Sequence, residues 1–208
     1  MTITLRSVKG TPLLDAEVDE NFNDLTNRIE GWNDLVQDVV VRSGTANAPS
    51  VNPYRDGLYA YAFDAASMGE CFANFHFGHD YVPGSMVYPH VHWSPNTTSI
   101  GVVRWGVEYT WARRHDSTGQ TVFPATQTLY IETTIDVDHQ YQHMVNESPD
   151  GSGIPGSTME VDSIIMCRFF RDAGHINDTF PDPVFLLSVD IHYQSLVKTT
   201  PLRFPPFN

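Results

Sequence analysis

Gly101-Val-Val-Arg-Trp-Gly-Val-Glu-Tyr-Thr-Trp-Ala112 is the most regular stretch of this 208-residue sequence. Apolar side chains occupy every second position from Val103 to Tyr109, with polar residues or glycine between them. Successive side chains of a β-strand point to opposite faces, so this alternation predicts a strand with one buried face. Residues 184–193 repeat the pattern, with Asp190 and His192 on the polar side. Both segments therefore predict strands of a sheet that packs one face on a hydrophobic core.

Aromatic and β-branched residues dominate the chain beyond residue 54, in short runs that glycine, proline, asparagine and aspartate interrupt. Such runs are typical of strands joined by turns. We expect strands at residues 57–63, 70–77, 86–93, 101–112, 126–134, 142–145, 158–171 and 184–194. No helical periodicity separates them, which predicts a mainly β fold, an antiparallel sandwich of the jelly-roll type.

The charge of the chain argues against nucleic acid as a partner. Asp plus Glu number 25 against 12 Lys plus Arg, a formal net charge of −13. A protein that binds DNA or RNA needs a basic surface to neutralise phosphates, and so does a protein that binds an anionic membrane. We find no signal peptide and no stretch that predicts membrane insertion. Cys71 and Cys167 lie far apart and predict buried free thiols in a protein made in the cytoplasm.

A different periodicity precedes the predicted sandwich. Apolar residues recur there at alternating steps of four and three, the spacing of a coiled-coil seam. The seam consists of Val18, Phe22, Leu25, Ile29, Trp32, Val36 and Val39. One helix cannot bury such a seam by itself, so the spacing predicts a helix that bundles with copies of itself. Thr11 and Pro12 fit the start of this helix, and Gly31 interrupts it. The alternative is one amphipathic helix packed on its own domain.

These patterns divide the chain into three parts. Residues 1–41 are expected to form a docking segment and an oligomerisation helix, residues 42–53 a linker, and residues 54–208 the jelly roll. The end of the chain, residues 201–208, contains three prolines and predicts an extended arm rather than a central strand.

Two histidines are the sharpest candidates for a metal site. His90 and His92 are two residues apart in a predicted strand, so both imidazoles point to one face. Together with Gly84 they resemble the first metal-binding motif of cupins, but the glutamate and further histidine of the cupin motifs have no counterpart here. A divalent metal could be held by six imidazoles gathered at a three-fold axis. The alternative is that His90 and His92 only hydrogen-bond their neighbours.

Other candidate metal-binding or catalytic motifs have less support from the sequence. His139 and His143 would share a metal-binding face only on a helix, and we expect a loop or strand end there. The sequence has no Gly-x-Ser-x-Gly elbow and no phosphate-binding Gly-x-x-x-x-Gly-Lys motif. We therefore expect no catalytic residues, and no cofactor apart from the candidate metal.

The N-terminal segment resembles a motif at the start of many tailed-bacteriophage fibre and virion-attachment proteins. The matching residues are 9–13, 16–19, 21–22 and 25. The body is similar to phage structural proteins of jelly-roll type at residues 79–85, 87–93, 105–109 and 185–194. This resemblance implies a virion protein, assembled in the host cytoplasm, whose helix follows a docking segment and trimerises.

Pattern and resemblance together predict a homotrimeric structural component of a tailed-phage particle. It would be a short fibre, a neck or tail appendage or an adaptor, and it would hold or position other virion proteins. Two alternatives remain open. One is a tail protein that binds a host receptor, either a glycan or a protein, through exposed aromatic or polar groups. The other is a cupin-like metalloenzyme that uses His90.

Overall fold

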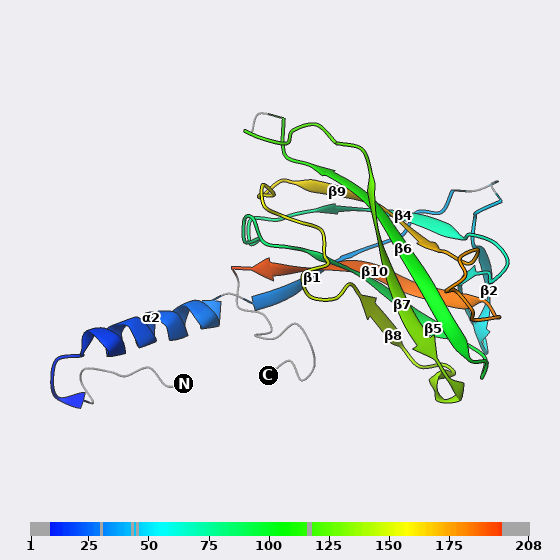
Figure 1. Cartoon of the computed structure of the whole chain (residues 1–208), viewed down its shortest axis with the longest axis horizontal. Helices are drawn as coiled ribbons and strands as arrows, with labels where there is room; N and C mark the ends of the chain where they lie inside the picture. The colour runs from blue at the N-terminus through cyan, green and yellow to red at the C-terminus, as the bar shows by residue number, and fades with distance from the viewer. Residues whose placement is uncertain (1–8, 30, 43, 45, 116–117, 197–208) are drawn as a thin grey trace.

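The structure, a computed structural model, describes residues 9–196 apart from residues 30, 43, 45, 116 and 117. One helix, α2 (Asp15–Ile29), extends away from a sandwich of two antiparallel sheets (Figure 1). Sheet A consists of β1 (Gly31–Gln37), β2 (Ser50–Arg55), β3 (Leu58–Phe63), β5 (Tyr88–Pro95), β8 (Met144–Glu147) and β10 (Val184–Ser195). Sheet B consists of β4 (Glu70–His76), β6 (Gly101–Ala112), β7 (Gln127–Ile135) and β9 (Ile164–Arg171). A short 3-10 helix, η1 (Val137–His139), follows β7.

The eight predicted strands are confirmed as β3 to β10. Their observed bounds agree with the predicted ones within two residues, except that β9 begins at Ile164 rather than at residue 158. From β3 to β10, consecutive strands alternate between the sheets except for the paired strands β6 and β7. The neighbours are β3, β10, β5 and β8 in sheet A, and β4, β9, β6 and β7 in sheet B. This is the strand order of a jelly roll. The predicted mainly β antiparallel sandwich is therefore confirmed.

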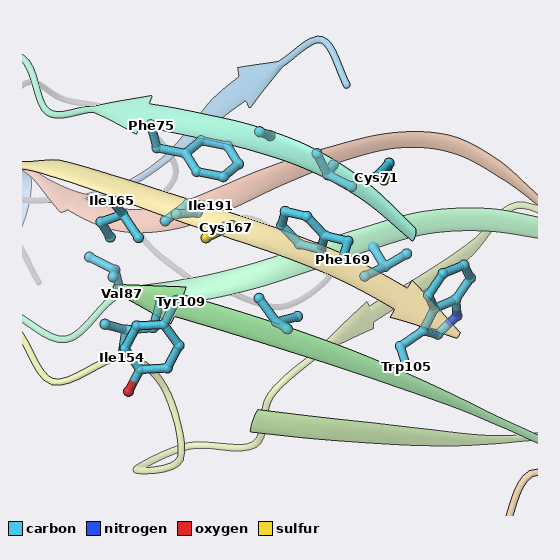
Figure 2. Close-up of a cluster of buried hydrophobic side chains, with 14 of the residues drawn as sticks. Cys71, Phe75, Val87, Trp105, Tyr109, Ile154, Ile165, Cys167, Phe169 and Ile191 are labelled. Carbon is cyan, nitrogen blue, oxygen red and sulfur yellow. The ribbon is translucent and has the colours of Figure 1, made fainter. Parts of the chain in front are cut away.

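The core lies between the two sheets, as Figure 2 shows. Trp93 of sheet A and Trp105 of sheet B are both fully buried, with ring centroids 6.1 Å apart. Each fully buried side chain of this size contributes roughly 1.5–3 kcal/mol or more relative to exposure. Cys71 and Cys167 are buried free thiols, as predicted. Burial raises the pKa of the Cys71 thiol to about 12, which keeps it protonated and unreactive.

The predicted helix is shorter than its apolar periodicity suggests. It begins at Asp15 rather than at Pro12. The carboxylate of Glu17 accepts a hydrogen bond from the backbone N–H of Leu14 at 2.7 Å and so caps the first turn of the helix. It ends at Ile29, and residues 31–37 form strand β1 instead. Glycine at position 31 weakens a helix by about 1 kcal/mol relative to alanine. As a strand, this segment satisfies the backbone groups along the edge of β10, pairing from Gly31↔Ser195 to Gln37↔Val189.

The prediction that the seam continues through Trp32, Val36 and Val39 is therefore wrong. Trp32 packs edge-on against Tyr88, with ring centroids 5.8 Å apart, and Val39 is half-buried against the core. Val36 lies on the outer face of sheet A and is 59% exposed. The part of the seam that is helical is Val18, Phe22, Leu25 and Ile29.

The segment expected as a linker, residues 42–53, includes the start of β2, which pairs with β3 and extends sheet A. The predicted C-terminal arm, residues 201–208, lies outside the described residues, as does the docking segment up to residue 8. Within the described part of the chain, no helix combines the length and the apolar character needed to cross a membrane.

Candidate functional site

Four adjacent strands of sheet A bring histidines and carboxylates together on its outer face. Asp190 of β10 lies opposite His90 of β5, which in turn lies opposite Glu147 of β8. One row further along, Asp34 of β1 lies opposite His192 of β10. We call Asp34, His90, His92, His143, Glu147, Asp190 and His192 the histidine–carboxylate cluster. Strand alternation explains the placement, because Val189 and Ile191, on either side of Asp190, point into the core.

Asp190 contacts both predicted histidines. His92 Nε2 lies 2.9 Å from Asp190 Oδ2, and His90 Nδ1 lies 3.0 Å from Asp190 Oδ1. The rings of His90 and His92 share one face, as their spacing predicts, with centroids 5.8 Å apart. His90 is 3% exposed and Asp190 4%. The second nitrogen of His92, Nδ1, lies 2.9 Å from Nε2 of His143, whose ring stacks on it.

His192 forms the other half of the cluster. Its Nε2 lies 2.6 Å from Asp34 Oδ1, and its Nδ1 lies 3.6 Å from Glu147 Oε1. The other oxygen of Glu147, Oε2, lies 3.1 Å from His90 Nε2. The rings of His90 and His192 meet edge to face, with centroids 3.9 Å apart. His90 therefore joins the two halves.

Neighbouring groups of opposite charge outweigh burial in setting the pKa values of His90, His192 and Asp190. Burial disfavours the imidazolium, but Asp190 and Glu147 still raise the pKa of His90 above its ordinary value. In the same way, Asp34 raises the pKa of His192 to about 9 despite burial. Burial also opposes ionisation of Asp190, yet the facing histidines hold its pKa well below its ordinary value. These three groups are thus stabilised as partners of opposite charge, whereas burial and the neighbouring His92 lower the pKa of His143.

Three atoms of the cluster are buried without a hydrogen bond: His90 Nε2, His192 Nδ1 and Asp190 Oδ1. Each lies 3.0–3.6 Å from an atom of the opposite charge, as an ion pair without hydrogen-bond geometry. The cluster consequently retains coordinating capacity that its internal contacts do not use.

Sequence reasoning found His90 and His92 but not the residues they meet. The alternation of residues 184–193 places Asp190 and His192 on the polar side of their strand, and that alternation is the available signal. The His139 and His143 pair does not share a face of a helix. His139 Nδ1 accepts the backbone N–H of Asp136 at 3.0 Å and caps η1, whereas His143 lies in the loop before β8, where a loop was expected.

Helix α2 is the second feature with a candidate function. Phe22 and Leu25 are 64% and 42% exposed, and Val18 is half-buried. No strand in the described part of the chain packs extensively against this helix. The side chain of Ile29 lies outside what the structure describes.

A groove of about 620 Å³ crosses the outer face of sheet B. Asn74, Met166 and Thr110 lie side by side across β4, β9 and β6. In the next row, Arg168 donates to Glu70 at 2.6 Å and to Glu108 at 2.8 Å. The groove is lined by Gln37, Asp38, Val40, Phe72, Ala73, Asn74, Glu108, Thr110, Thr126, Met166, Cys167 and Arg168.

No family model and no curated protein matches this chain. Among solved structures, the chain is similar to carbohydrate-binding modules. A CBM61 module in complex with β-1,4-galactotriose is 14% identical over 82% of this chain and 91% of that one, with a TM-score of 0.29. The CBM22-2 xylan-binding domain of Paenibacillus barcinonensis Xyn10C is 11% identical over 78% and 91%, with a TM-score of 0.36. A CBM28 module specific for non-crystalline cellulose is 17% identical over 76% and 85%, with a TM-score of 0.29. TM-scores this low support no conclusion about a ligand of this chain.

Proposed function

We propose that this protein is a structural component of a tailed-phage particle that assembles as a homotrimer through α2. The observation that carries the proposal is the exposure of Phe22 and Leu25, at coiled-coil spacing, on a helix that extends away from the sandwich (Figure 1). The resemblance of residues 9–25 to virion-attachment proteins supplies the kind of particle and the number of subunits.

Energetics favour a bundled helix over an isolated one. A helix of 15 residues is marginal in water by itself, and most helical stability in proteins comes from packing an apolar face. Burying a Phe or Leu side chain contributes roughly 1.5–3 kcal/mol, and a trimer would bury this face of α2 in every subunit. The sandwich would then form the body around the same axis.

In this proposal the protein positions other virion proteins and carries out no catalysis. It would be made in the host cytoplasm and retained in the particle as a fibre, appendage or adaptor.

The oligomeric state tests the role of α2. Light scattering coupled to gel filtration should give three times the chain mass of 23.4 kDa for the full-length protein. A Phe22→Asp/Leu25→Asp variant should give a single chain mass, with a weaker helical signal from α2 and an unchanged β-sheet signal from the sandwich in the far-ultraviolet spectrum. Asn23→Asp, on an exposed position off the seam, is the matched control and should remain trimeric. A wild-type monomer would refute the proposal.

The particle assignment needs a separate test. Phage particles should be purified from a host that carries this gene, then digested and analysed by mass spectrometry. Peptides of this chain should copurify with the particles at a stoichiometry that is a multiple of three. Their absence from intact particles would contradict a virion role even if the protein is a trimer.

A second candidate function, binding of a host-surface glycan, rests on the groove of sheet B. Its volume suits a small ligand, and its lining offers amide, hydroxyl, carboxylate and guanidinium groups beside the apolar side chain of Met166. Such a mixture matches the hydroxyl groups and the C–H surfaces of a sugar.

Glycan-array screening tests this second function. Wild-type protein should bind a defined set of glycans, and an Asn74→Ala/Met166→Ala variant should lose them. Ile176→Ala, at a loop position that is 87% exposed and outside the groove, is the control and should bind like the wild type. Binding that survives the groove variant would place the glycan elsewhere.

A further inference from the structure

We propose that His90, His92 and Asp190 bind one divalent first-row transition-metal ion within a single chain. Each of the three offers one ligand atom, and these atoms all lie within 4.8 Å of one another. The proposal goes beyond the assembly role and does not depend on it, since all three ligands come from one subunit. It also differs from a site at a three-fold axis, which would need imidazoles from three subunits.

The backbone holds these ligands before any ion arrives. His90 and His92 belong to β5, in the middle of sheet A, and Asp190 lies directly opposite His90 on the neighbouring strand β10. Ligands on paired strands are positioned more firmly than ligands on loops. Ion binding would therefore require small side-chain adjustments rather than folding of a new segment.

The distances between ligand atoms suit one ion. His92 Nε2 lies 2.9 Å from Asp190 Oδ2, and His90 Nδ1 lies 3.0 Å from the other carboxylate oxygen, Oδ1. With metal–ligand bonds of about 2.1 Å, adjacent ligands lie about 3.0 Å apart in an octahedral site and about 3.4 Å apart in a tetrahedral one. Each histidine therefore lies at about the spacing of neighbouring octahedral positions from the Asp190 oxygen that faces it.

Buried groups without hydrogen bonds point independently to a ligand. Asp190 Oδ1, in a residue that is only 4% exposed, has no hydrogen-bond partner, although His90 Nδ1 lies 3.0 Å from it as an ion pair. Buried polar atoms in folded proteins are nearly always satisfied, and an unplaced ion or water is one of the standard explanations for an exception. An ion shared by the three ligands would satisfy Asp190 Oδ1 directly.

The donor set selects the class of metal. Two imidazoles and one carboxylate suit zinc, nickel, cobalt or iron(II), whereas calcium and magnesium take oxygen ligands. The side chain of His92 is 18% exposed, which gives an ion a path from solvent and leaves room for water ligands. The second nitrogen of His92, Nδ1, lies 2.9 Å from His143 Nε2, a contact that orients the His92 imidazole.

A second set of three, Asp34, His90 and His192, also brings ligand atoms within 4.8 Å. We favour the first set because Asp190 lies within 3.0 Å of both of its histidines and is buried, whereas Asp34 has a half-exposed side chain on the edge strand β1. His192→Gln separates the two sets, since it removes a ligand from the second set alone.

The experiment uses untagged, metal-stripped, full-length protein titrated calorimetrically with NiCl₂ and ZnCl₂, with the bound metal counted by mass spectrometry. One ion per chain is expected. His92→Gln and Asp190→Asn should each weaken binding by at least about 100-fold. His115→Gln, at an exposed loop histidine outside the cluster, should bind within about two-fold of the wild type. Circular dichroism confirms that each variant is folded, and the partly exposed His92 keeps the test valid if Asp190→Asn unfolds.

Several results would overturn the proposal. One is the absence of binding at millimolar metal, and another is one ion per three chains, which would move the site to an axis. Equal losses in His92→Gln and His115→Gln would indicate adventitious binding to histidines. A greater loss in His192→Gln than in His92→Gln would assign the ion to the second set.

Discussion

The buried guanidinium of Arg171 and the histidine–carboxylate cluster are two polar networks of one sandwich that are satisfied to different degrees. Arg171 is fully buried, and its five N–H groups all donate: two to Asp178 and the others to the backbone carbonyls of Phe63, Phe180 and Asp182. The cluster on sheet A has more titratable groups, yet leaves three buried atoms without a hydrogen bond.

This difference in hydrogen bonding distinguishes the structural network around Arg171 from the histidine–carboxylate cluster, which can still bind a ligand. Arg171 ties the end of β9 to the loop that precedes β10, and no donor is left over for another molecule. In the cluster, Asp190 and His90 hold coordinating atoms close together without using them fully. Buried charge alone therefore does not mark a functional site; incomplete satisfaction of that charge does.

The largest expected effect lies in the satisfied network. Arg171→Met should lower the free energy of unfolding by about 3–5 kcal/mol, because it leaves Asp178 and three carbonyls buried without their partner. Urea denaturation measures the change. Arg114→Met, at a side chain that is 61% exposed, should cost less than about 0.5 kcal/mol. Similar losses in both variants would show that burial and full hydrogen bonding of Arg171 do not set its contribution to stability.

A smaller effect is expected at the cluster, and it should depend on metal. With free NiCl₂ at 100 times its Kd, the wild-type protein should gain about 2.7 kcal/mol of unfolding free energy. Asp190→Asn should gain almost nothing, because the shared ligand loses its charge. Urea denaturation with NiCl₂ or with EDTA checks both. Equal gains in the two proteins would mean that the ion binds elsewhere.

The smallest expected effect is at the rim of the cluster. Asp34→Asn should lower stability by about 0.5 kcal/mol, because Asp34 is half-exposed and its ion pair with His192 is screened by water. The loss should shrink further in 1 M NaCl, which shortens the range of electrostatic interactions. A loss above about 2 kcal/mol would show that the rim of the cluster is as essential as Arg171.

Local patterns predicted most of the sandwich, because strands such as β6 and β10 alternate cleanly between core and surface. They failed at β1. Trp32 and Val36 continue a heptad spacing by chance, and their strand conformation depends on an open edge of β10 more than 150 residues away in the sequence. Because the strand conformation of β1 depends on this distant partner, the local spacing of apolar residues does not predict it.

The site was predictable only in part for the same reason. The spacing of His90 and His92 shows that they share a face, and the alternation near Asp190 shows that it points away from the core. Their meeting depends on the pairing of β5 with β10, which spans about 100 residues. Glu147, from β8, had no comparable signal.

Strand β1 also determines how the sandwich responds to mechanical load. α2 continues from the Gly31 end of β1, and β1 pairs antiparallel with β10 over all seven of its residues (Figure 1). A pull on the helix therefore acts along the strand and loads these hydrogen bonds together, in shear, instead of opening them one after another. β10 is held on its other side by β5, so the force passes into the middle of sheet A. A strand that the heptad pattern concealed thus makes the junction between helix and sandwich resistant to tension.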